Sequence, residues 1–310
     1  MSAVEAEQPI AYAHPAGRGY WRASGRRFFR QKVPVAALCL LVLLALVGGF
    51  AHRLVPHGWN GVHHGAAWEN HPPTLQRGWS LWMGTDNVGR STLERTIWGL
   101  HFTLIAAFFG ALAATAIGVV LGSIASLVGG VVESVIMSVA DFTTTFPVLV
   151  TIIAAFAYLL PLTETKAILV FAVYLWAFVA RVVRSRLRAL GAETFVEAAR
   201  ALGASELRVL VRHLLPNAAG ALIVATTSLF GQIVLIEATA EFFGFGINSL
   251  TRPTLGNLIA EATQSGIGKF NFLDLGWWTW TTPGIALVLL LVSVNLLGDG
   301  LAAALDPRSR

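Results

Sequence analysis

A series of long apolar stretches constrains this chain more than any other feature. The stretches span residues 33–50, 101–128, 131–160, 168–183, 218–242 and 283–304. At ~1.5 Å rise per residue, about twenty helical residues cross a ~30 Å hydrocarbon core. Hydrophobic residues make up 55% of the chain and charged residues 13%, a balance that excludes an ordinary soluble domain. The sequence therefore predicts an all-α polytopic membrane protein with six transmembrane helices.

Basic residues flank these stretches in an asymmetric way that predicts the orientation. The tail 1–32 ends in Arg22, Arg26, Arg27, Arg30 and Lys32, and the loop 184–217 is also rich in arginine. By the positive-inside rule both segments lie in the cytoplasm, with four crossings between them. The tail 305–310 then returns to the cytoplasm, and the loops 51–100 and 244–281 are external. Because the arginines sit beside apolar stretches, they indicate topology rather than nucleic-acid binding.

The five later stretches and their connections, residues 101–304, form the predicted core. Within the second stretch, small residues recur at every fourth position: Gly110, Ala114, Gly118, Gly122 and Ser126. Such a stripe lets the backbones of two helices approach closely in lipid. We favour packing within this chain over an interface with another subunit.

The loop contains a predicted helical hairpin over residues 194–217. Thr194 followed by Glu197 has the spacing of a capping box, which predicts the start of a first helix. Gly203 predicts its end, and Ser205 with Glu206 predicts the start of a second helix. In that second helix the apolar residues at helical spacing are Leu207, Leu210, Val211 and Leu214.

Pro216 is expected to end the second helix, since proline lacks the amide proton that a helix interior needs. Two interpretations of the hairpin remain open at this point. It could dock a soluble partner, or its polar residues could serve only as helix caps and topology signals.

Polar residues inside the apolar stretches are candidates for a pathway or for structural hydrogen bonds. They are Asp141, Gln232, Glu237 and Asn295. Ionisable groups at membrane depth are costly and usually face a bundle interior or a wet cavity. No serine or histidine accompanies them as nucleophile and base, so we expect no catalytic activity.

Neither a nucleotide site nor a metal site is predicted. Residues 266–270 lack the leading glycine and the Ser/Thr after lysine that a phosphate-binding loop requires. The first external loop holds His52, His57, His63, His64 and His71, with Glu69 nearby. Their spacing matches no closed ligand pattern, so we interpret them as solvated loop residues. We expect no bound cofactor, and any energy from ATP must come through another chain.

Three separated motifs resemble the permease subunits of ABC importers. Glu197-Ala198-Ala199, Gly203 and His213-Leu214-Leu215-Pro216 resemble the EAA loop of that family. Gly84-Thr85-Asp86 with Gly89-Arg90, and Asn295 to Gly300 with Asp306-Pro307-Arg308, resemble elements of the C-type subunit of dipeptide, oligopeptide and nickel importers. Glu237 and the turn Phe243-Gly244-Phe245-Gly246 match in kind. The resemblance implies a type I importer permease fold with a cytoplasmic coupling hairpin.

The same resemblance implies roles for individual residues. Coupling to an ATPase would involve Glu197, Ala198, Ala199, Gly203, Ser205, Leu215 and Pro216. Residues expected to dock an external binding protein are Thr85, Asp86, Asn87, Arg90 and Arg252. The pathway would lie between two permeases and be lined by the third to fifth spans.

The implied partners are a second, homologous permease, two ATPase subunits that hold Mg-ATP, an external substrate-binding protein and membrane lipid. The implied location is the bacterial inner membrane, and the implied substrate is a peptide. Ala302 and Ala303 depart from the family pattern, which leaves the substrate open. Three alternatives remain: an importer of nickel or a metal chelate, an ion-coupled secondary transporter that uses Asp141 and Glu237, and a scaffold protein.

Overall fold

The computed structural model describes residues 18–61, 69–75, 78–247, 252–264 and 276–306. Within these ranges the regular elements are helices, and one β-bridge joins Thr85 to Ser91. The longer helices are α1 (Arg18–Arg30), α2 (Lys32–Gly49), α4 (Thr92–Val128), α5 (Gly130–Thr145), α6 (Val148–Tyr158), α7 (Glu164–Gly191), α8 (Thr194–Ala201), α10 (Leu215–Phe242), α11 (Leu255–Gln264) and α12 (Trp277–Leu305). Short turns of helix are α3 (Ala51–Leu54), η2 (Trp79–Leu81), α9 (Glu206–Val209) and the π-helix Leu210–Leu214.

The predicted apolar stretches correspond to helices long and apolar enough to cross a membrane. Five single helices meet that test in the described residues: α2, α4, α7, α12 and the run Glu206–Phe242 that ends in α10. The helices α5 and α6 meet the same test only as a pair and are bent by 86° at their break, so the described residues hold five such helices, or six spans if this bent pair counts as one. The all-α prediction is confirmed. Helix α12 begins at Trp277, inside the predicted loop 244–281, and carries Pro283 in its interior.

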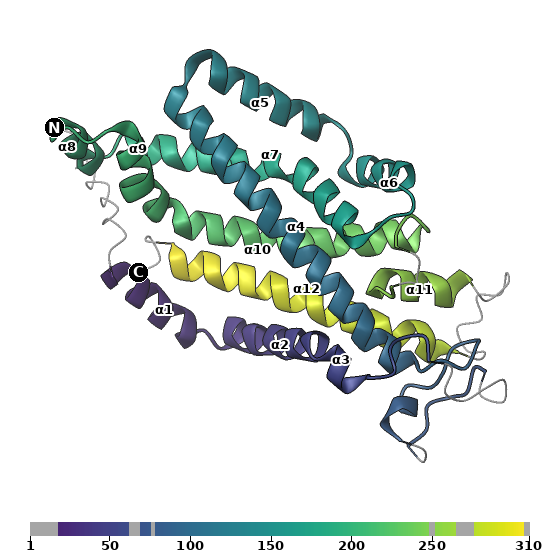
Figure 1. Ribbon diagram of the computed structural model, residues 1–310. Helices are drawn as coiled ribbons and strands as arrows, with labels where there is room; N and C mark the ends of the chain where they lie inside the picture. The colour runs from purple at the N-terminus through teal and green to yellow at the C-terminus, as the bar shows by residue number, and fades with distance from the viewer. Residues whose placement is uncertain (1–17, 62–68, 76–77, 248–251, 265–275, 307–310) are drawn as a thin grey trace, which may run out of the picture.

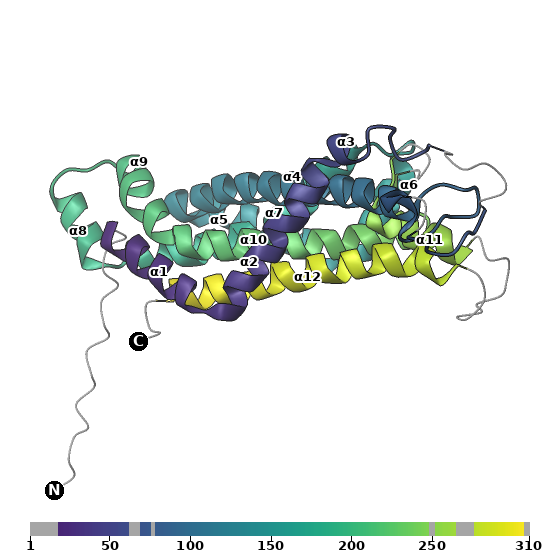
Figure 2. The same cartoon turned by 90° about the horizontal axis from the view of Figure 1, so that it is seen from below.

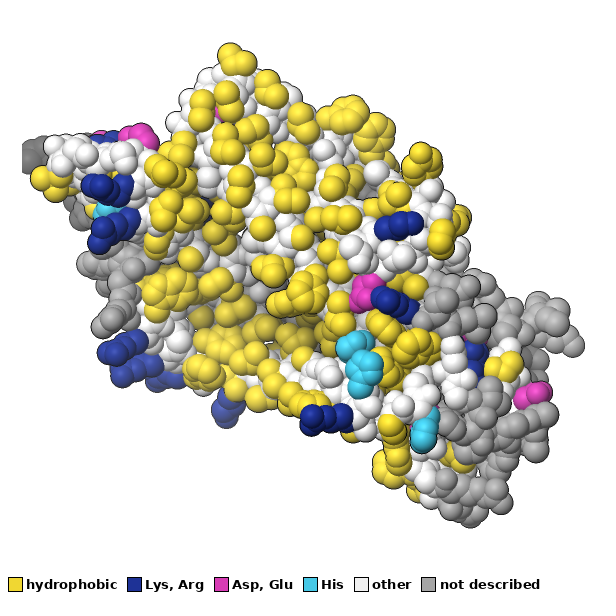
Figure 3. Space-filling model, viewed as in Figure 1, with side chains coloured by type: hydrophobic (Ala, Val, Ile, Leu, Met, Phe, Trp, Pro, Cys, Tyr) yellow, Lys and Arg dark blue, Asp and Glu magenta, His cyan; other side chains and the backbone are white. Residues whose placement is uncertain are grey.

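The helices form an elongated bundle in which α4 crosses α7, α10 and α12 (Figure 1). Helix α2 crosses the bundle obliquely and packs against α12 and α4 (Figure 2). One end of the bundle carries α8, α9 and the start of α1, and we call it the hairpin end. The opposite end carries α3, α6 and α11. Apolar side chains cover the middle of the face in Figure 3, and Lys and Arg lie towards both of its ends.

The most extensive contact between two long helices joins α4 to α7, and glycines allow it. A Cβ atom on Gly118 would lie 2.5 Å from Val179 Cβ and 2.8 Å from the Trp176 carbonyl oxygen. One on Gly122 would lie 2.7 Å from the Ala180 carbonyl oxygen. The predicted stripe of small residues therefore packs within the chain, as favoured from the sequence, and only glycine permits this spacing.

A second close contact joins α2 to α12. A Cβ atom on Gly300 would lie 2.2 Å from Pro34 Cβ, and Phe28 packs beside Leu297 and Ala304. Helix α1 is tied to the same end of α12, because the Tyr20 hydroxyl donates to the Leu305 carbonyl over 2.7 Å. Gly300, in the C-terminal motif, is therefore needed for the close approach of α2 to α12.

The break between α5 and α6 follows from Pro147. Proline cannot donate to the α5 ladder, and Phe146 before it is extended at φ −83°, ψ 142°. The Tyr174 hydroxyl of α7 donates to the Phe146 carbonyl over 2.6 Å. The carbonyl that the break leaves free is thereby satisfied, as burial in lipid or protein requires.

We predict that Gly118→Leu destabilises the protein by roughly 1–3 kcal/mol, the usual cost of overpacking. The added side chain must displace Val179 and the α7 backbone. Unfolding in mixed detergent micelles measures this free energy. Ala116→Leu is the control, since Ala116 is exposed on the same helix. Equal stability of the two variants would contradict the close packing of α4 on α7.

Candidate functional site

The hairpin at one end of the bundle links α7 to α10. Helix α7 ends at Gly191, α8 follows from Thr194, and Gly203 turns the chain at φ +81° into α9. The expected helix stop at Gly203 is confirmed. The predicted capping box at Thr194 is wrong, because the cap position is Glu193 and its side chain makes no capping bond. The tight exit from α7 places Thr194 inside the helix already, so its hydroxyl is in the wrong position to cap.

Arg200 connects three parts of this hairpin. Its Nε and Nη2 donate to the two carboxylate oxygens of Glu206, over 2.8 and 3.1 Å, across the Gly203 turn. Its Nη1 donates to the Gly191 carbonyl at the end of α7 over 3.3 Å. An exposed ion pair contributes little to stability by itself. Here it restricts the angle between α8 and α9, and with it the direction of the hairpin.

The second half of the hairpin runs straight into α10 without a stop. The prediction that Pro216 ends this helix is wrong, because Pro216 lies in the first turn of α10. The π-helix before Pro216 already has a different hydrogen-bond register from an α-helix. The amide proton that proline lacks therefore breaks no regular α-helical bond. Asn217 Nδ2 donates to the His213 carbonyl over 2.5 Å. The hairpin is thus continuous with a membrane span.

The π-helix also divides the predicted apolar face. Leu210 and Leu214 are buried in the core, whereas Leu207 and Val211 are 67% and 57% exposed. Leu202, at the tip of the turn, is 89% exposed. The hairpin therefore presents apolar side chains away from the bundle, next to the exposed Glu197 and Ala198.

The other predicted coupling residues lie on the same hairpin. Gly203, Ser205 and Pro216 are exposed, and Ala199 and Leu215 are half-buried. The structure therefore brings the EAA motif residues together at the hairpin end.

An ion-pair cluster anchors α5 beside the base of this hairpin. The buried Glu133 of α5 pairs with Arg184 Nε and with Arg188 Nη2, the latter over 2.5 Å. The sequence alone did not single out Glu133 or predict its partners. The arginine-rich end of α7 was the available signal, since a buried carboxylate needs a charged partner.

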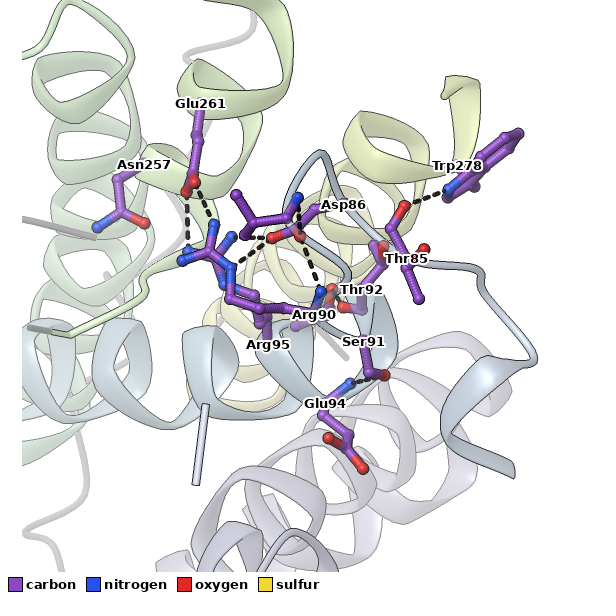
Figure 4. Close-up of polar contacts among 12 residues, drawn as sticks. Thr85, Asp86, Arg90, Ser91, Thr92, Glu94, Arg95, Asn257, Glu261 and Trp278 are labelled. Carbon is purple, nitrogen blue, oxygen red and sulfur yellow. Dashed lines mark hydrogen bonds and ion pairs between the residues drawn. The ribbon is translucent and has the colours of Figure 1, made fainter. Parts of the chain in front are cut away.

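A second ion-pair cluster, which we call the clamp, lies at the opposite end (Figure 4). Arg90 joins Asp86 to Glu261 over 2.6 and 2.5 Å, and Arg95 joins the same two carboxylates over 3.0 and 2.8 Å. The arginine side chains are only 5% and 4% exposed. The clamp therefore ties the start of α4 to α11.

The loop before the clamp is held against α12. Trp278 Nε1 donates to the Thr85 carbonyl over 2.9 Å, and the His71 amide donates to Thr85 Oγ1 over 2.9 Å. A Cβ atom on Gly84 would meet both the His71 carbonyl oxygen and the Trp278 ring at 2.6 Å. The motif residues Thr85, Asp86 and Arg90 are thus buried in contacts within the chain, and Asn87 is exposed.

The remaining docking candidate, Arg252, also makes contacts within the chain. Its Nη1 pairs with Glu164 at the start of α7, and its guanidinium carbon lies 5.5 Å from the centre of the Phe102 ring. These contacts join the segment before α11 to α7 and α4. Its side chain remains 43% exposed.

The polar candidates of the spans separate into two kinds. Glu237 is 2% exposed on α10, and its Oε2 has no hydrogen-bond partner within the described residues. Gln232, Asn295 and Asp141 are exposed. Asp141 lies 3.3 Å from Arg181 Nε of α7.

The histidine-rich loop is only partly described. His63 and His64 lie outside the described residues, as does the segment 266–270. His52 instead stacks edge-on against Trp98, with ring centres 4.4 Å apart. In the part of the chain that the structure covers, no three His, Cys, Asp or Glu side chains gather as metal ligands.

We predict that Asp86→Ala lowers the free energy of unfolding by roughly 3–5 kcal/mol, the usual cost of breaking a buried ion pair. The substitution leaves Arg95 with one carboxylate and removes the acceptor of the Val88 and Arg90 amides. Unfolding in mixed micelles measures this free energy. Asn87→Ala is the neighbouring control at an exposed position, and an equal loss there would count against the clamp.

The clamp also predicts a dependence on acid. Burial raises the pKa of Glu261, but hydrogen bonds and charge from Arg95 and Arg90 outweigh it and hold the pKa below its usual value. Because the pKa of Glu261 is lower in the folded state, its ion pairs stabilise the fold at pH values above the ordinary glutamate pKa of about 4.3. This contribution is lost as pH falls through the folded pKa. The difference in Tm between the unaltered chain and Glu261→Gln should shrink below about pH 4.3, and a constant difference would contradict it.

Comparison with known proteins places these features in one family. The family described as binding-protein-dependent transport system inner membrane component matches residues 114–310. The N-terminal TM domain of oligopeptide transport permease C matches residues 19–73. The segment between them contains the loop of the clamp.

Individual proteins agree with this match. An oligopeptide transport system permease protein of Mycobacterium tuberculosis is 33% identical over 92% of this chain and 94% of its own length. A dipeptide transport system permease protein of Alkalihalophilus pseudofirmus is 30% identical over 94% of this chain and 90% of its own. A putative peptide permease protein of Brucella suis is 31% identical, covering 95% and 93%.

Solved structures show the same fold. A chain of the MetNI methionine ABC transporter, in an inward-facing conformation, aligns with a TM-score of 0.54. The alignment covers 68% of this chain and 96% of that one at 20% identity. The bent span, the hairpin and the matched relatives agree: the chain belongs to the binding-protein-dependent transport system inner membrane components, the membrane-spanning permease subunits of ABC importers.

Proposed function

We propose that this chain is one of two homologous permeases in an ATP-driven importer of peptides. The relatives named as oligopeptide, dipeptide and peptide permeases support the substrate class, because they match over nearly the whole chain. In this proposal two partner ATPases hold Mg-ATP and an external binding protein delivers the peptide. The hairpin end and both chain termini face the cytoplasm of a bacterial cell, and the clamp faces outward.

The observation that carries the proposal is the construction of the hairpin. It presents exposed Leu202, Leu207 and Val211 beside Glu197, on an element that Arg200 ties to the end of α7. An apolar tip outside the bundle favours a protein partner, because large exposed apolar side chains beside polar ones mark interaction sites. A connector between an ATPase and the spans must also be stiff, since coupling needs an element whose position both the ATPase and the spans influence.

The structure supports a route for this coupling. Movement of the hairpin would act on α7 through Gly191 and on α10 through the continuous π-helix. The pairs from Glu133 to Arg184 and Arg188 would carry it to α5. In alternating access, ATP binding would then draw the hairpin ends of the two permeases together, and hydrolysis would let them separate.

The whole complex in proteoliposomes tests the substrate class. We expect ATP-dependent uptake of a radiolabelled oligopeptide that requires the binding protein. Uptake of nickel alone would contradict the peptide assignment. Uptake that persists without the ATPase subunits would contradict the importer mechanism and favour an ion-coupled transporter.

We predict that Gly203→Pro lowers peptide uptake per ATP hydrolysed at least about tenfold, while membrane insertion is unchanged. Gly203 has φ +81°, whereas proline requires about −65°. The angle between α8 and α9 must therefore change. Uptake and ATPase rates of the reconstituted complex measure the coupling. Gly191→Ala is the control, because nothing lies within 4 Å of the added carbon. Normal coupling in Gly203→Pro would contradict the role of the hairpin.

A further inference from the structure

Helix α5 carries two different exposed stripes side by side. At about 100° per residue, one stripe consists of Ser134, Ser138, Asp141 and Thr145, and all four are exposed. The adjacent stripe consists of Val131, Val135, Val139, Phe142 and Phe146, which are also exposed. The third side of the helix, with Glu133 and Ala140, is buried. One helix thus shows a polar and an apolar surface outside the bundle.

The polar stripe lies at membrane depth. Asp141 follows Glu133 by eight residues, which places it about 12 Å further along the helix axis from the hairpin end. Its side chain is 73% exposed. A carboxylate in contact with lipid tails at that depth is strongly unfavourable. The polar stripe of α5 therefore faces water or a polar partner, and the neighbouring valine stripe suits lipid or an apolar partner.

The basic residue beside Asp141 is already engaged with the α5 backbone. Arg181 Nη2 donates to the Ala140 carbonyl over 2.8 Å and to Thr144 Oγ1 over 2.5 Å. Its Nε lies 3.3 Å from Asp141 Oδ1, yet it makes no hydrogen bond within the described residues. Arg181 therefore holds Asp141 by charge alone and leaves room around the carboxylate for another donor.

An open groove connects this position with the hairpin end. Ser134, Ser138 and Asp141 line it on α5, and Arg184 and Arg188 line it on α7. Glu133 pairs with both arginines, so its single negative charge offsets one of their two positive charges. Asp141 is thus the groove's carboxylate without a close hydrogen-bonding partner among the residues that the structure describes. A cation that enters the groove would meet it.

We propose that the polar stripe of α5 lines the substrate pathway and that Asp141 binds the N-terminal ammonium group of a peptide in transit. The ammonium group is the one positive charge that peptides with a free N-terminus share. It forms charge-assisted hydrogen bonds with a carboxylate. The hydroxyls of Ser134 and Ser138, which line the groove, both donate and accept, so they suit the peptide main chain. The inference rests on the proposed function for the identity of the ligand.

Cysteine labelling of the assembled complex tests the pathway without reference to the substrate. Cys39 is the only cysteine of the chain, so Cys39→Ala provides a cysteine-free background. In it, Ser138→Cys should react with membrane-impermeant methanethiosulfonates. The ratio of the cationic to the anionic rate reports the charge of the groove, to which Asp141 contributes one negative charge among the arginines. Asp141→Asn should therefore lower this ratio at least about fivefold.

The matched control is Val139→Cys, on the apolar stripe one residue away, which should stay unlabelled. An unlabelled Ser138→Cys in the assembled complex would overturn the proposal, since the stripe would then be covered by the partner permease. A ratio of the two rates that Asp141→Asn leaves unchanged would also overturn it.

Peptide uptake tests the role of the ammonium group. Asp141→Asn should lower the maximal rate of peptide uptake about tenfold, and Asp141→Glu should restore most of it. The affinity of the separate binding protein for peptide stays unchanged and is measured alongside. Normal uptake by Asp141→Asn would overturn the assignment of the ammonium group. If the unaltered complex moves no peptide, the proposed function fails, and with it the ammonium assignment; the labelling result still decides whether α5 lines the pathway.

Discussion

The close packing of α4 on α7 is the contact on which the rest of the structure depends. In a bilayer, burial of apolar surface does not drive helices together, so association relies on tight contact. Gly118 and Gly122 provide it by letting the α7 backbone approach without a side chain between. Helix α7 then serves as the axis of the molecule. Ion pairs attach α5 to it at Arg184 and Arg188, and the hairpin extends from its end.

The two ends of the bundle use charge in different ways. At the clamp, the arginines and Asp86 are buried, and their ion pairs hold α4 and α11 in one arrangement. Removing these charges from water costs free energy that the ion pairs must offset. At the hairpin end, Arg200 and Glu206 are exposed and set the angle of a projecting element. A rigid base and an exposed connector are what a subunit driven by another chain requires.

Local patterns in the sequence predicted the spans, the small-residue stripe and the turn at Gly203, because each depends on residues close together in the chain. Pro216 was misinterpreted, since a π-helix upstream removes the conflict that proline usually creates. The pairing of Arg90 with Glu261, 171 positions apart, has no local signal at all. The burial of Thr85, Asp86 and Arg90 could not be predicted either, because a sequence motif does not reveal whether its side chains point inward.

We expect the hairpin to move as one rigid body with α7, because Arg200 joins it to the Gly191 carbonyl. Spin labels at Ser185→Cys on α7 and Ala201→Cys on α8, in the Cys39→Ala background, give the distance between the two elements by double electron–electron resonance. Both positions are exposed. In the reconstituted complex we expect one narrow distance distribution that ATP binding leaves unchanged. A broad distribution, or one that shifts on ATP binding, would contradict it.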